Sequence, residues 1–368
     1  MFYIRSMSVT ERPDIPVEQR PGRAAATNHA GRFEPYARVP IDDGWDPGEA
    51  PPSLRTELRE EHPRSVITRN SSPDIPFDRS INPYRGCEHG CIYCFARPSH
   101  AYLGLSPGLD FETRLVAKPD APEVLARELS KPGYRPRTIA IGTNTDPYQP
   151  VERDRRIMRG LLEVLLEFRH PVGIVTKGTL IERDIDLLSQ MARLNLVRVG
   201  VSVTTLDRGL ARVMEPRVPA PQRRLQTIRA LAEAGVEVRV MASPIIPALN
   251  DHEVERILEA GREAGAAAAS WIMLRLPREV APLFRDWLEA HFPDRAARVM
   301  GHVRAMHGGQ DYSAQWGRRM RGEGAYAEMI AARFRRAAAR LGLDARLPPL
   351  DCGQFRVPPR PGDQLSLF

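Results

Sequence analysis

Short apolar, β-branched runs alternate along most of the chain with longer stretches in which apolar residues recur at helical spacing. The alternation begins at about Val66 and is typical of repeated βα units built around a parallel sheet. The runs predict six strands, at residues 79–85, 138–142, 172–176, 197–203, 236–242 and 270–276. The first contains Pro83, which removes a backbone hydrogen-bond donor from the interior of that strand.

Helical patterns separate these strands, at residues 157–168, 181–194, 221–234 and 251–264. No seventh or eighth strand is evident in the sequence, because residues 282–307 and 326–341 have the pattern of helices rich in alanine, arginine and leucine. We therefore expect an α/β fold, a partial (β/α)6 TIM-like barrel over residues 66–280 with a helical C-terminal region at 281–346.

Both ends of the chain differ from this pattern. Residues 1–65 are rich in proline, glycine and charge and have no apolar period, so they cannot bury enough apolar surface to offset the entropy of ordering. We predict a largely disordered arm that carries no chemistry. Residues 347–368 become rich in proline again, and we predict an extended tail.

Composition narrows the class of protein. Apolar residues make up 42% and charged residues 27% of the chain, and no segment is apolar for long enough to span a membrane or to act as a signal peptide. We therefore predict a cytoplasmic protein. The net charge of +7 favours a polyanionic partner such as DNA, because lysine and arginine release condensed counterions when they neutralise phosphates. The alternative is a solvated basic surface.

Three of the four cysteines follow one another at the spacing Cys-x3-Cys-x2-Cys: Cys87, Cys91 and Cys94. A structural zinc site is closed by four protein ligands, whereas a catalytic metal centre keeps a position open. Three thiolates on one short loop therefore suggest an iron-sulfur cube with one iron left open. Clustered thiols also need a reducing compartment. The alternatives are a zinc knuckle completed by His89 or His100, or three unrelated thiols.

The loop resembles the signature of the radical S-adenosylmethionine (radical SAM) enzymes. The resemblance implies a 4Fe-4S cluster whose open iron chelates the amino and carboxylate groups of S-adenosyl-L-methionine. One electron, from a donor such as flavodoxin or ferredoxin, would then cleave the cofactor to a 5′-deoxyadenosyl radical. Tyr93, directly before the third cysteine, occupies the position where the family usually places an aromatic residue near the adenine.

Further candidates for cofactor binding follow the later strands, because barrels of this kind carry their reacting groups on loops after the carboxyl ends of the strands. Asn144 and Asp146 lie in a polar turn where, by the resemblance, the family binds the methionine amino group. Lys177 and Arg217 are candidates to pair with the cofactor's carboxylate, and Ser202 or Glu215 to hydrogen-bond its ribose. Each could equally be an ordinary cap or a solvated loop residue.

Within the superfamily the chain is most similar to the spore photoproduct lyase-like branch, which is also described as DNA repair photolyase-like. The similarity covers residues 78–280 and includes the cysteine loop and the segments 97–103 and 177–186. The lyase uses a hydrogen-donating cysteine between the cluster loop and the later barrel, and this chain has none between Cys94 and Cys352. We therefore do not expect thymine-dimer reversal by that mechanism, and we expect Cys352 to be an inert thiol.

The last five residues suggest a partner. They resemble the pentapeptide by which bacterial replication and repair proteins bind the DNA sliding clamp: Gln364, Leu365, Ser366, Leu367 and Phe368. An extended tail would insert its two leucines and its phenylalanine into an apolar groove, while the glutamine fixes the register. The alternative is an apolar end that packs on its own domain.

Three functions are compatible with these patterns. The first is a radical SAM enzyme that acts in DNA repair or modification, or is recruited to DNA. The second is a radical SAM enzyme that modifies a protein or a small molecule. The third is a non-enzymatic clamp-binding protein with a structural iron-sulfur cluster.

Overall fold

Six parallel strands form the centre of the protein in a computed structural model, which describes residues 21–34 and 54–359. The strands are β3 (Arg79–Ile81), β6 (Ile139–Ile141), β7 (Val172–Thr176), β8 (Val197–Ser202), β9 (Val238–Ile245) and β10 (Ala268–Met273). They pair in chain order, and a short antiparallel strand, β2 (Thr68–Arg69), lies on the outer side of β3. Since β10 and β2 do not pair, the sheet is an open, partial barrel, which confirms the expected fold class.

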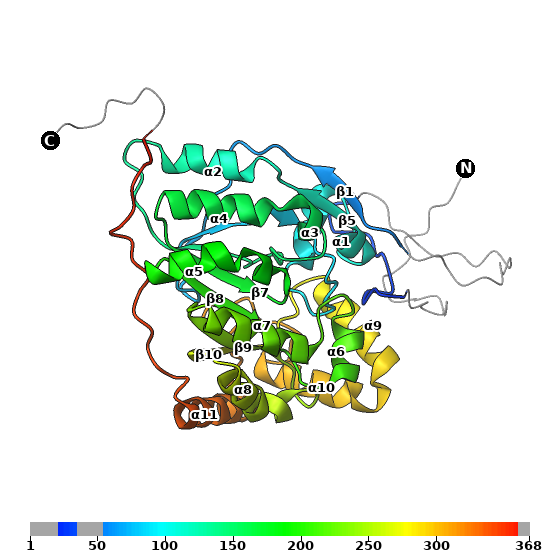
Figure 1. The fold of residues 1–368 in the computed structure, drawn as a ribbon. Coiled ribbons are helices and arrows are strands. Elements are labelled where there is room, and N and C mark those ends of the chain that lie inside the picture. The colour runs from blue at the N-terminus through cyan, green and yellow to red at the C-terminus, as the bar shows by residue number, and fades with distance from the viewer. Residues whose placement is uncertain (1–20, 35–53, 360–368) are drawn as a thin grey trace, which may run out of the picture.

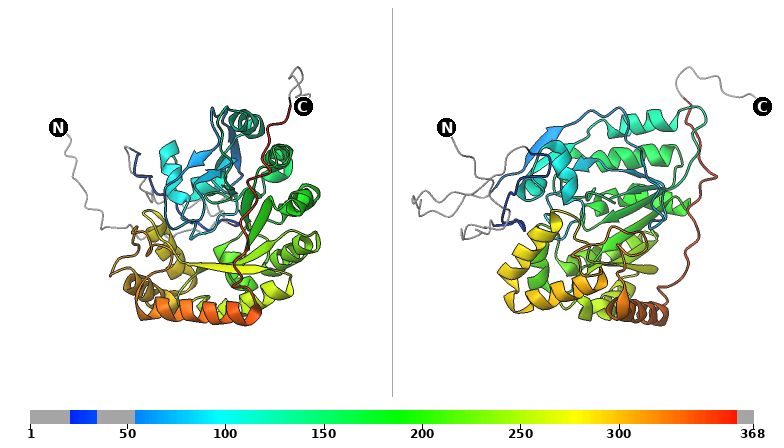
Figure 2. Two further views of the ribbon diagram at one scale, coloured as in Figure 1. Left: turned by 90° about the vertical axis from the view of Figure 1, so that its left-hand side faces the viewer. Right: turned by 180° about the vertical axis from the view of Figure 1, so that it is seen from behind.

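Helices cover the outer face of this curved sheet (Figure 1; Figure 2, left). Those that connect the strands are α2 (Ala121–Leu129), α3 (Glu152–Arg155), α4 (Ile157–Glu167), α5 (Ile185–Arg193), α6 (Arg208–Met214), α7 (Pro221–Glu233) and α8 (Val254–Glu263). The helical C-terminal region consists of α9 (Val280–His291), α10 (Pro293–Met306) and α11 (Gly324–Leu341). Among the described residues, none of these helices is both long and apolar enough to cross a bilayer.

The first predicted strand is wrong in its extent. β3 ends at Ile81, and the chain resumes as β4 (Tyr84–Arg85) in a different, three-stranded sheet with β5 (Arg114–Ala117) and β1 (Glu57–Glu60). Pro83 lies at the break, because proline has no N–H for the barrel ladder. The cysteine loop therefore begins from this small second sheet, which flanks the barrel.

The predicted N-terminal arm also needs correction where the structure describes it. Ala24 and Ala25 are buried, and β1 pairs in parallel with β5. Neither segment shows an apolar period of its own; both are ordered by hydrogen bonds to the body of the protein, which a pattern search does not detect. Residues 1–20 and 35–53 of the predicted arm lie outside the described residues.

Residues 347–359 of the tail form no helix or strand, and hydrogen bonds attach them to the barrel. The N–H of Asp351 donates to the carbonyl of Asn195, and that of Arg356 donates to the carbonyl of Phe168, at 2.9 and 3.0 Å. These partners precede β8 and β7, so the tail crosses the amino-terminal end of the barrel (Figure 2, left). The clamp-binding-like pentapeptide at 364–368 lies outside the described residues.

Two buried histidines make the fold sensitive to acid. Burial lowers the pKa of His100 and of His170 to about 4. An unfolded histidine titrates near its usual value of about 6.5, so the unfolded chain binds more protons below that pH. The stability that these neutral histidines contribute is complete above about pH 6.5 and is lost as the pH falls towards 4.

We therefore predict that, between pH 7.5 and pH 5, the free energy of unfolding of His170→Gln falls by about 1–2 kcal/mol less than that of the wild type. Urea unfolding at the two pH values measures this difference for the variant and for the wild type. The matched control is His62→Gln, because the His62 side chain is exposed. Equal slopes for the two variants would contradict the prediction.

Candidate functional site

The cysteine loop connects β4 to a short 3-10 helix, η1 (Arg97–Leu103), and lies at the carboxyl ends of the barrel strands. Gln149, on the segment after β6, accepts a hydrogen bond from the Glu88 N–H at 2.8 Å and donates to the Gly86 carbonyl at 3.2 Å. The Ile92 N–H donates to the carbonyl of Met214 at the end of α6. The loop is thus tied to the barrel mouth on two sides.

Each of the three clustered cysteines begins a tight turn. The carbonyl of Cys87 accepts from the Gly90 N–H, that of Cys91 from the Cys94 N–H, and that of Cys94 from the Arg97 N–H, all at 3.2 Å. Such i to i+3 bonds fold a short loop back on itself. The predicted ligands are therefore brought together on one compact loop, with Cys87 and Cys91 buried, Cys94 half-buried and all three unbridged.

Arg97 holds this loop from inside the protein. Its side chain is fully buried and donates to the carbonyls of Cys91 and Gly90, at 3.1 and 3.0 Å. The same guanidinium donates to the carbonyls of Pro107 and Gly108 at 3.0 Å and pairs with Glu112 at 2.5 Å. Five donors in a planar fork suit arginine and could not be replaced by a lysine ammonium.

Glu112 also binds the N-terminal segment, through hydrogen bonds to its carboxylate and its backbone carbonyl. The backbone N–H groups of Ala24 and Ala25 donate to its two carboxylate oxygens, at 3.2 and 3.0 Å. Arg23 donates to its backbone carbonyl at 2.7 Å. The segment that the sequence pattern predicted to be a disordered arm is therefore part of the support of the cysteine loop.

The burial of the thiols shapes their chemistry. Burial raises the pKa of Cys87, Cys91 and Cys94, and the nearby carboxylates of Asp146 and Glu215 raise those of Cys87 and Cys91 further. Without a cation the thiols are protonated at neutral pH, and a bound metal group would release those protons. Three sulfur donors on one loop fit an iron-sulfur cluster, whereas hard cations take oxygen ligands.

No group of three or more histidine, cysteine, aspartate or glutamate side chains in the described chain is placed to hold a metal ion. Thiolates that bind different irons of one cluster stand further apart than the ligands of a single ion. The assignment of the three cysteines as cluster ligands thus rests on donor chemistry and stays a prediction.

Asp146 links three parts of the mouth. Its oxygens accept hydrogen bonds from the Thr176 hydroxyl at 2.6 Å and from the Lys177 N–H at 2.7 Å, and His89 Nδ1 lies 3.3 Å away. Burial would raise the pKa of Asp146, but His89 and these hydrogen bonds outweigh it and lower the pKa to about 2. The carboxylate is thus engaged by the protein itself. Asn144 lies half-buried on the same turn.

Lys177 brings an uncommitted cation to the mouth. Its ammonium lies 5.7 Å from the centre of the Tyr93 ring and forms no ion pair with any residue that the structure describes. Burial lowers the pKa of Lys177, but Cys91, Glu215 and Asp146 outweigh burial and raise the pKa above its usual value. The side chain is therefore charged at neutral pH.

Tyr93 is anchored in a buried polar network below the loop. Its hydroxyl donates to Glu215 and lies 3.2 Å from the Thr204 hydroxyl. Glu215 also pairs with Arg224 at 2.6 Å, and both side chains are almost completely buried. Burial would raise the pKa of Glu215, but the charges of Arg224 and Lys177 lower it.

The two remaining candidates lie near this network. Ser202 is buried at the end of β8, and its carbonyl accepts from Arg224 at 3.0 Å. Arg217 pairs with Glu88 of the cysteine loop at 3.2 Å, so its guanidinium already has an anionic partner. Among the predicted cofactor residues, Asp146 and Arg217 are thus committed within the protein, whereas Lys177 is uncommitted.

Sequence reasoning missed the residues that support the loop, namely Arg97, Glu112, Gln149 and Arg224. Their hydrogen bonds join positions that lie far apart in the chain, up to 89 residues for Glu112 and Arg23. A usable signal did exist, since Arg97 and Glu112 are charged residues close to the cysteine motif. Nothing in the spacing showed that they face one another.

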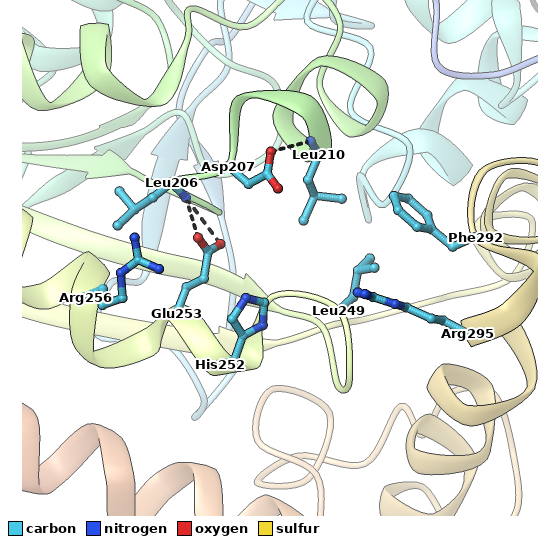
Figure 3. Close-up of a pocket in the computed structure, with 9 residues that line it drawn as sticks. All are labelled: Leu206, Asp207, Leu210, Leu249, His252, Glu253, Arg256, Phe292 and Arg295. Atoms are coloured by element: carbon cyan, nitrogen blue, oxygen red, sulfur yellow. Dashed lines mark hydrogen bonds between the residues drawn. The ribbon is translucent and has the colours of Figure 1, made fainter.

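Two further features are not part of the cysteine loop. Cys352 is on the pinned tail, at the amino-terminal end of the barrel and opposite the mouth, in keeping with the inert role expected for it. A cavity of about 550 Å³ opens between α6, α8 and α10 (Figure 3). Its lining includes no cysteine: Leu206, Asp207, Leu210, Leu249, His252, Glu253, Arg256, Phe292 and Arg295.

The fold and the loop together define a class of protein, an open βα barrel with a Cys-x3-Cys-x2-Cys loop at its mouth. The chain matches the radical SAM superfamily over residues 81–261. It is also 37% identical to an uncharacterized protein of Mycobacterium tuberculosis over 273 residues, which cover 71% of this chain and 80% of that protein. The chain belongs to the radical SAM superfamily.

More distant similarities agree with this assignment. An uncharacterized protein of Methanocaldococcus jannaschii is 27% identical over 215 residues, covering 58% of this chain and 76% of that protein. Among solved structures, spore photoproduct lyase complexed with dinucleoside spore photoproduct superposes with a TM-score of 0.57 at 15% identity, over 77% of this chain and 79% of that one. At this level of identity the similarity is one of fold.

A substitution of Gly90 would show how rigidly Glu112 is packed against the cysteine loop. The φ of Gly90 is +63°, and a Cβ added there would lie 2.7 Å from a Glu112 carboxylate oxygen. Gly104 has a φ of +68° with nothing within 4 Å of an added Cβ, so it is a matched control for backbone strain alone.

We predict that Gly104→Ala costs about 1–2 kcal/mol of stability and that Gly90→Ala costs about 1–3 kcal/mol more. Chemical denaturation of both variants measures the difference. Equal losses would show that the Glu112 carboxylate moves aside freely.

Proposed function

We propose that this chain is a radical SAM enzyme that binds a 4Fe-4S cluster through Cys87, Cys91 and Cys94 and cleaves S-adenosyl-L-methionine. The observation that carries the proposal is the three-thiol loop at the mouth of an open barrel, in a chain that belongs to this superfamily. When bound, such a cluster supplies the single electron for cleavage of the cofactor's sulfonium. A low-potential protein such as flavodoxin or ferredoxin would deliver that electron, and a reducing cytoplasm suits the free thiols.

The chain's own residues would bind and orient the cofactor. Lys177 is charged and has no anionic partner among the described residues, so it suits the carboxylate of the methionine moiety. Asp146 fixes the backbone of Lys177 and therefore acts as a positioning residue. Asn144 and Ser202 remain candidates for the amino group and the ribose, and the ring of Tyr93 for contact with the adenine.

We propose DNA as the substrate class, in repair or modification. The net charge of +7 and the fold shared with spore photoproduct lyase support this proposal. The thiol outside the cysteine loop, Cys352, lies at the opposite end of the barrel. This position supports a reaction other than dimer reversal with a cysteine as hydrogen donor.

Recruitment by the sliding clamp remains part of the proposal and rests on the sequence of residues 364–368. The described part of the tail, as far as residue 359, crosses the end of the barrel opposite the mouth. Deletion of residues 364–368 should abolish clamp binding, and unchanged binding would remove this part of the proposal.

The central test is anaerobic reconstitution with iron and sulfide. We expect about four irons per chain, and formation of 5′-deoxyadenosine when dithionite and S-adenosyl-L-methionine are added. Cys87→Ala, Cys91→Ala and Cys94→Ala should each reduce product formation to background, whereas Cys352→Ala should behave as the wild type. A stable cluster without cofactor cleavage would favour the non-enzymatic alternative.

Lys177 gives a prediction for cofactor binding. We expect Lys177→Met to weaken the binding of S-adenosyl-L-methionine to the reconstituted protein by roughly ten- to hundred-fold, because a charged hydrogen bond to the carboxylate is lost. Equilibrium binding measures the change, and iron content shows whether the cluster is retained. The control is Lys131→Met, at an exposed position on the outer surface. Unchanged affinity with full iron content would contradict the assigned role.

A further inference from the structure

Aromatic rings and guanidinium groups form a row along the rim of the barrel mouth. At its outer end the rings of Phe33 and Tyr102 lie 5.1 Å apart, and Arg32 lies over both, at 4.8 and 5.1 Å from their centres. Phe33 is 55% and Tyr102 67% exposed, so these rings contribute little to the packing of the core. Large exposed apolar side chains gathered at one place usually mark a binding surface.

The inner end of the row reaches the cysteine loop. Arg275, two residues beyond β10, lies 4.6 Å from the centre of the Phe95 ring and 6.0 Å from that of Tyr312, to whose hydroxyl it donates at 3.3 Å. Phe95 directly follows Cys94, the third cysteine of the loop. The inner stack is therefore part of the mouth itself.

Arg278 connects the two ends. It lies three residues after Arg275 and directly before Glu279, which pairs with Arg32 at 3.0 Å. It also contributes, after Arg32, to lowering the pKa of the Tyr102 hydroxyl. The segment that follows β10 thus carries guanidinium groups to both aromatic clusters. We define the rim row as Arg32, Phe33, Phe95, Tyr102, Arg275, Arg278 and Tyr312.

Two of the three arginines in the rim row have no carboxylate partner. Arg32 pairs with Glu279 at 3.0 Å, whereas Arg275 and Arg278 form no ion pair with any residue in the described ranges. The Nε atom of Arg275 is buried and has no hydrogen-bond partner there either. Arg278 lies beside the exposed ring of Tyr102, and Arg275 beside the half-buried ring of Phe95. Unpaired guanidinium groups beside such rings suit a ligand that offers both anionic groups and flat faces.

We propose that the rim row binds single-stranded nucleic acid, with bases stacked on Tyr102 and Phe33 and with backbone phosphates beside Arg278 and Arg275. Stacking on aromatic rings together with pairing of phosphates to arginine is how proteins hold single strands without reading their sequence. A duplex hides the faces of its bases, so the exposed rings favour a single strand or an extruded nucleotide.

The position of the row explains how a bound strand would meet the reaction site. It runs from the outer rings to Phe95, beside Cys94, so that a nucleotide held on it lies next to the mouth. This inference rests on the proposed function for DNA as the substrate, but binding itself needs neither cluster nor cofactor. The net charge of +7 agrees with an anionic polymer as the ligand.

The test is fluorescence anisotropy with a labelled oligothymidylate single strand and a labelled duplex of the same length, at several salt concentrations. Tyr102→Ala should weaken single-strand binding by roughly five- to hundred-fold, while Tyr102→Phe should restore it. Arg278→Ala should reduce the slope of log affinity against log salt by about 0.7, the value for one phosphate contact on a single strand.

The matched control is Arg336→Ala on α11, which removes the same charge from an exposed position away from the mouth. Thermal unfolding of each variant confirms that the fold is intact. Equal losses for Arg278→Ala and Arg336→Ala, unchanged binding by Tyr102→Ala, or tighter binding of the duplex would each overturn the inference.

The outcome is separable from that of the proposed function. Suppose that Tyr102→Ala weakens single-strand binding but the wild type forms no 5′-deoxyadenosine. That result would support the role of the rim row and contradict the proposed enzyme activity. Suppose instead that the wild type cleaves the cofactor but the rim variants bind the single strand as the wild type does. That result would support the proposed enzyme activity and contradict the role of the rim row.

Discussion

The buried ion pair between Arg97 and Glu112 is the contact on which the cysteine loop depends. Burying two charges is costly, and the cost is offset only where further hydrogen bonds satisfy both groups. Arg97 uses its remaining donors on four backbone carbonyls, and Glu112 accepts from the N–H groups of Ala24 and Ala25. One pair therefore joins the loop, the segment after η1 and the N-terminal segment, and the loss of either partner would leave a buried charge.

A second set of carboxylates determines the electrostatics on the other side of the loop. Asp146 and Glu215 are both ionised at neutral pH, because their partners lower their pKa values despite burial. Their charges oppose ionisation of Cys87 and Cys91 and favour the cationic form of Lys177. These charges thus favour protonated thiols, and a cationic metal group would reverse that balance by replacing the thiol protons.

The sequence predicts the parts of the molecule that depend on local pattern. The strands from β6 to β10 are detected because buried β-branched runs alternate with amphipathic helices, and the loop is detected because its ligand spacing is local. Pro83 indicates a weak point in the first strand, because proline lacks a backbone donor. It does not indicate that the chain joins a different sheet after that point. The role of residues 21–34 was missed because their order comes from Glu112, which lies far away in the chain.

The same distinction applies within the candidate site. Cofactor residues were predicted because they follow strands, and the barrel does bring Lys177, Ser202 and Asp146 to one end. Which of them are already engaged could not be predicted, because an acceptor such as Asp146 is occupied by residues from two other segments. Spacing identifies the chemistry that a residue can do, but only packing shows whether the residue is still available for it.

Some charged side chains of the mouth already have partners within the protein, and others do not. This difference indicates which of them are available to bind a ligand. Below the loop, Glu215, Arg224 and Asp146 are satisfied by one another and by nearby hydroxyl and backbone groups, so they hold the site in shape and offer little to a ligand. Unpaired cations of the described mouth include Lys177 inside it and two arginines of the rim row, Arg275 and Arg278. A small inner set would suffice for the proposed cofactor, whereas recognition of the proposed substrate would depend on the rim, where Phe33 and Tyr102 are exposed.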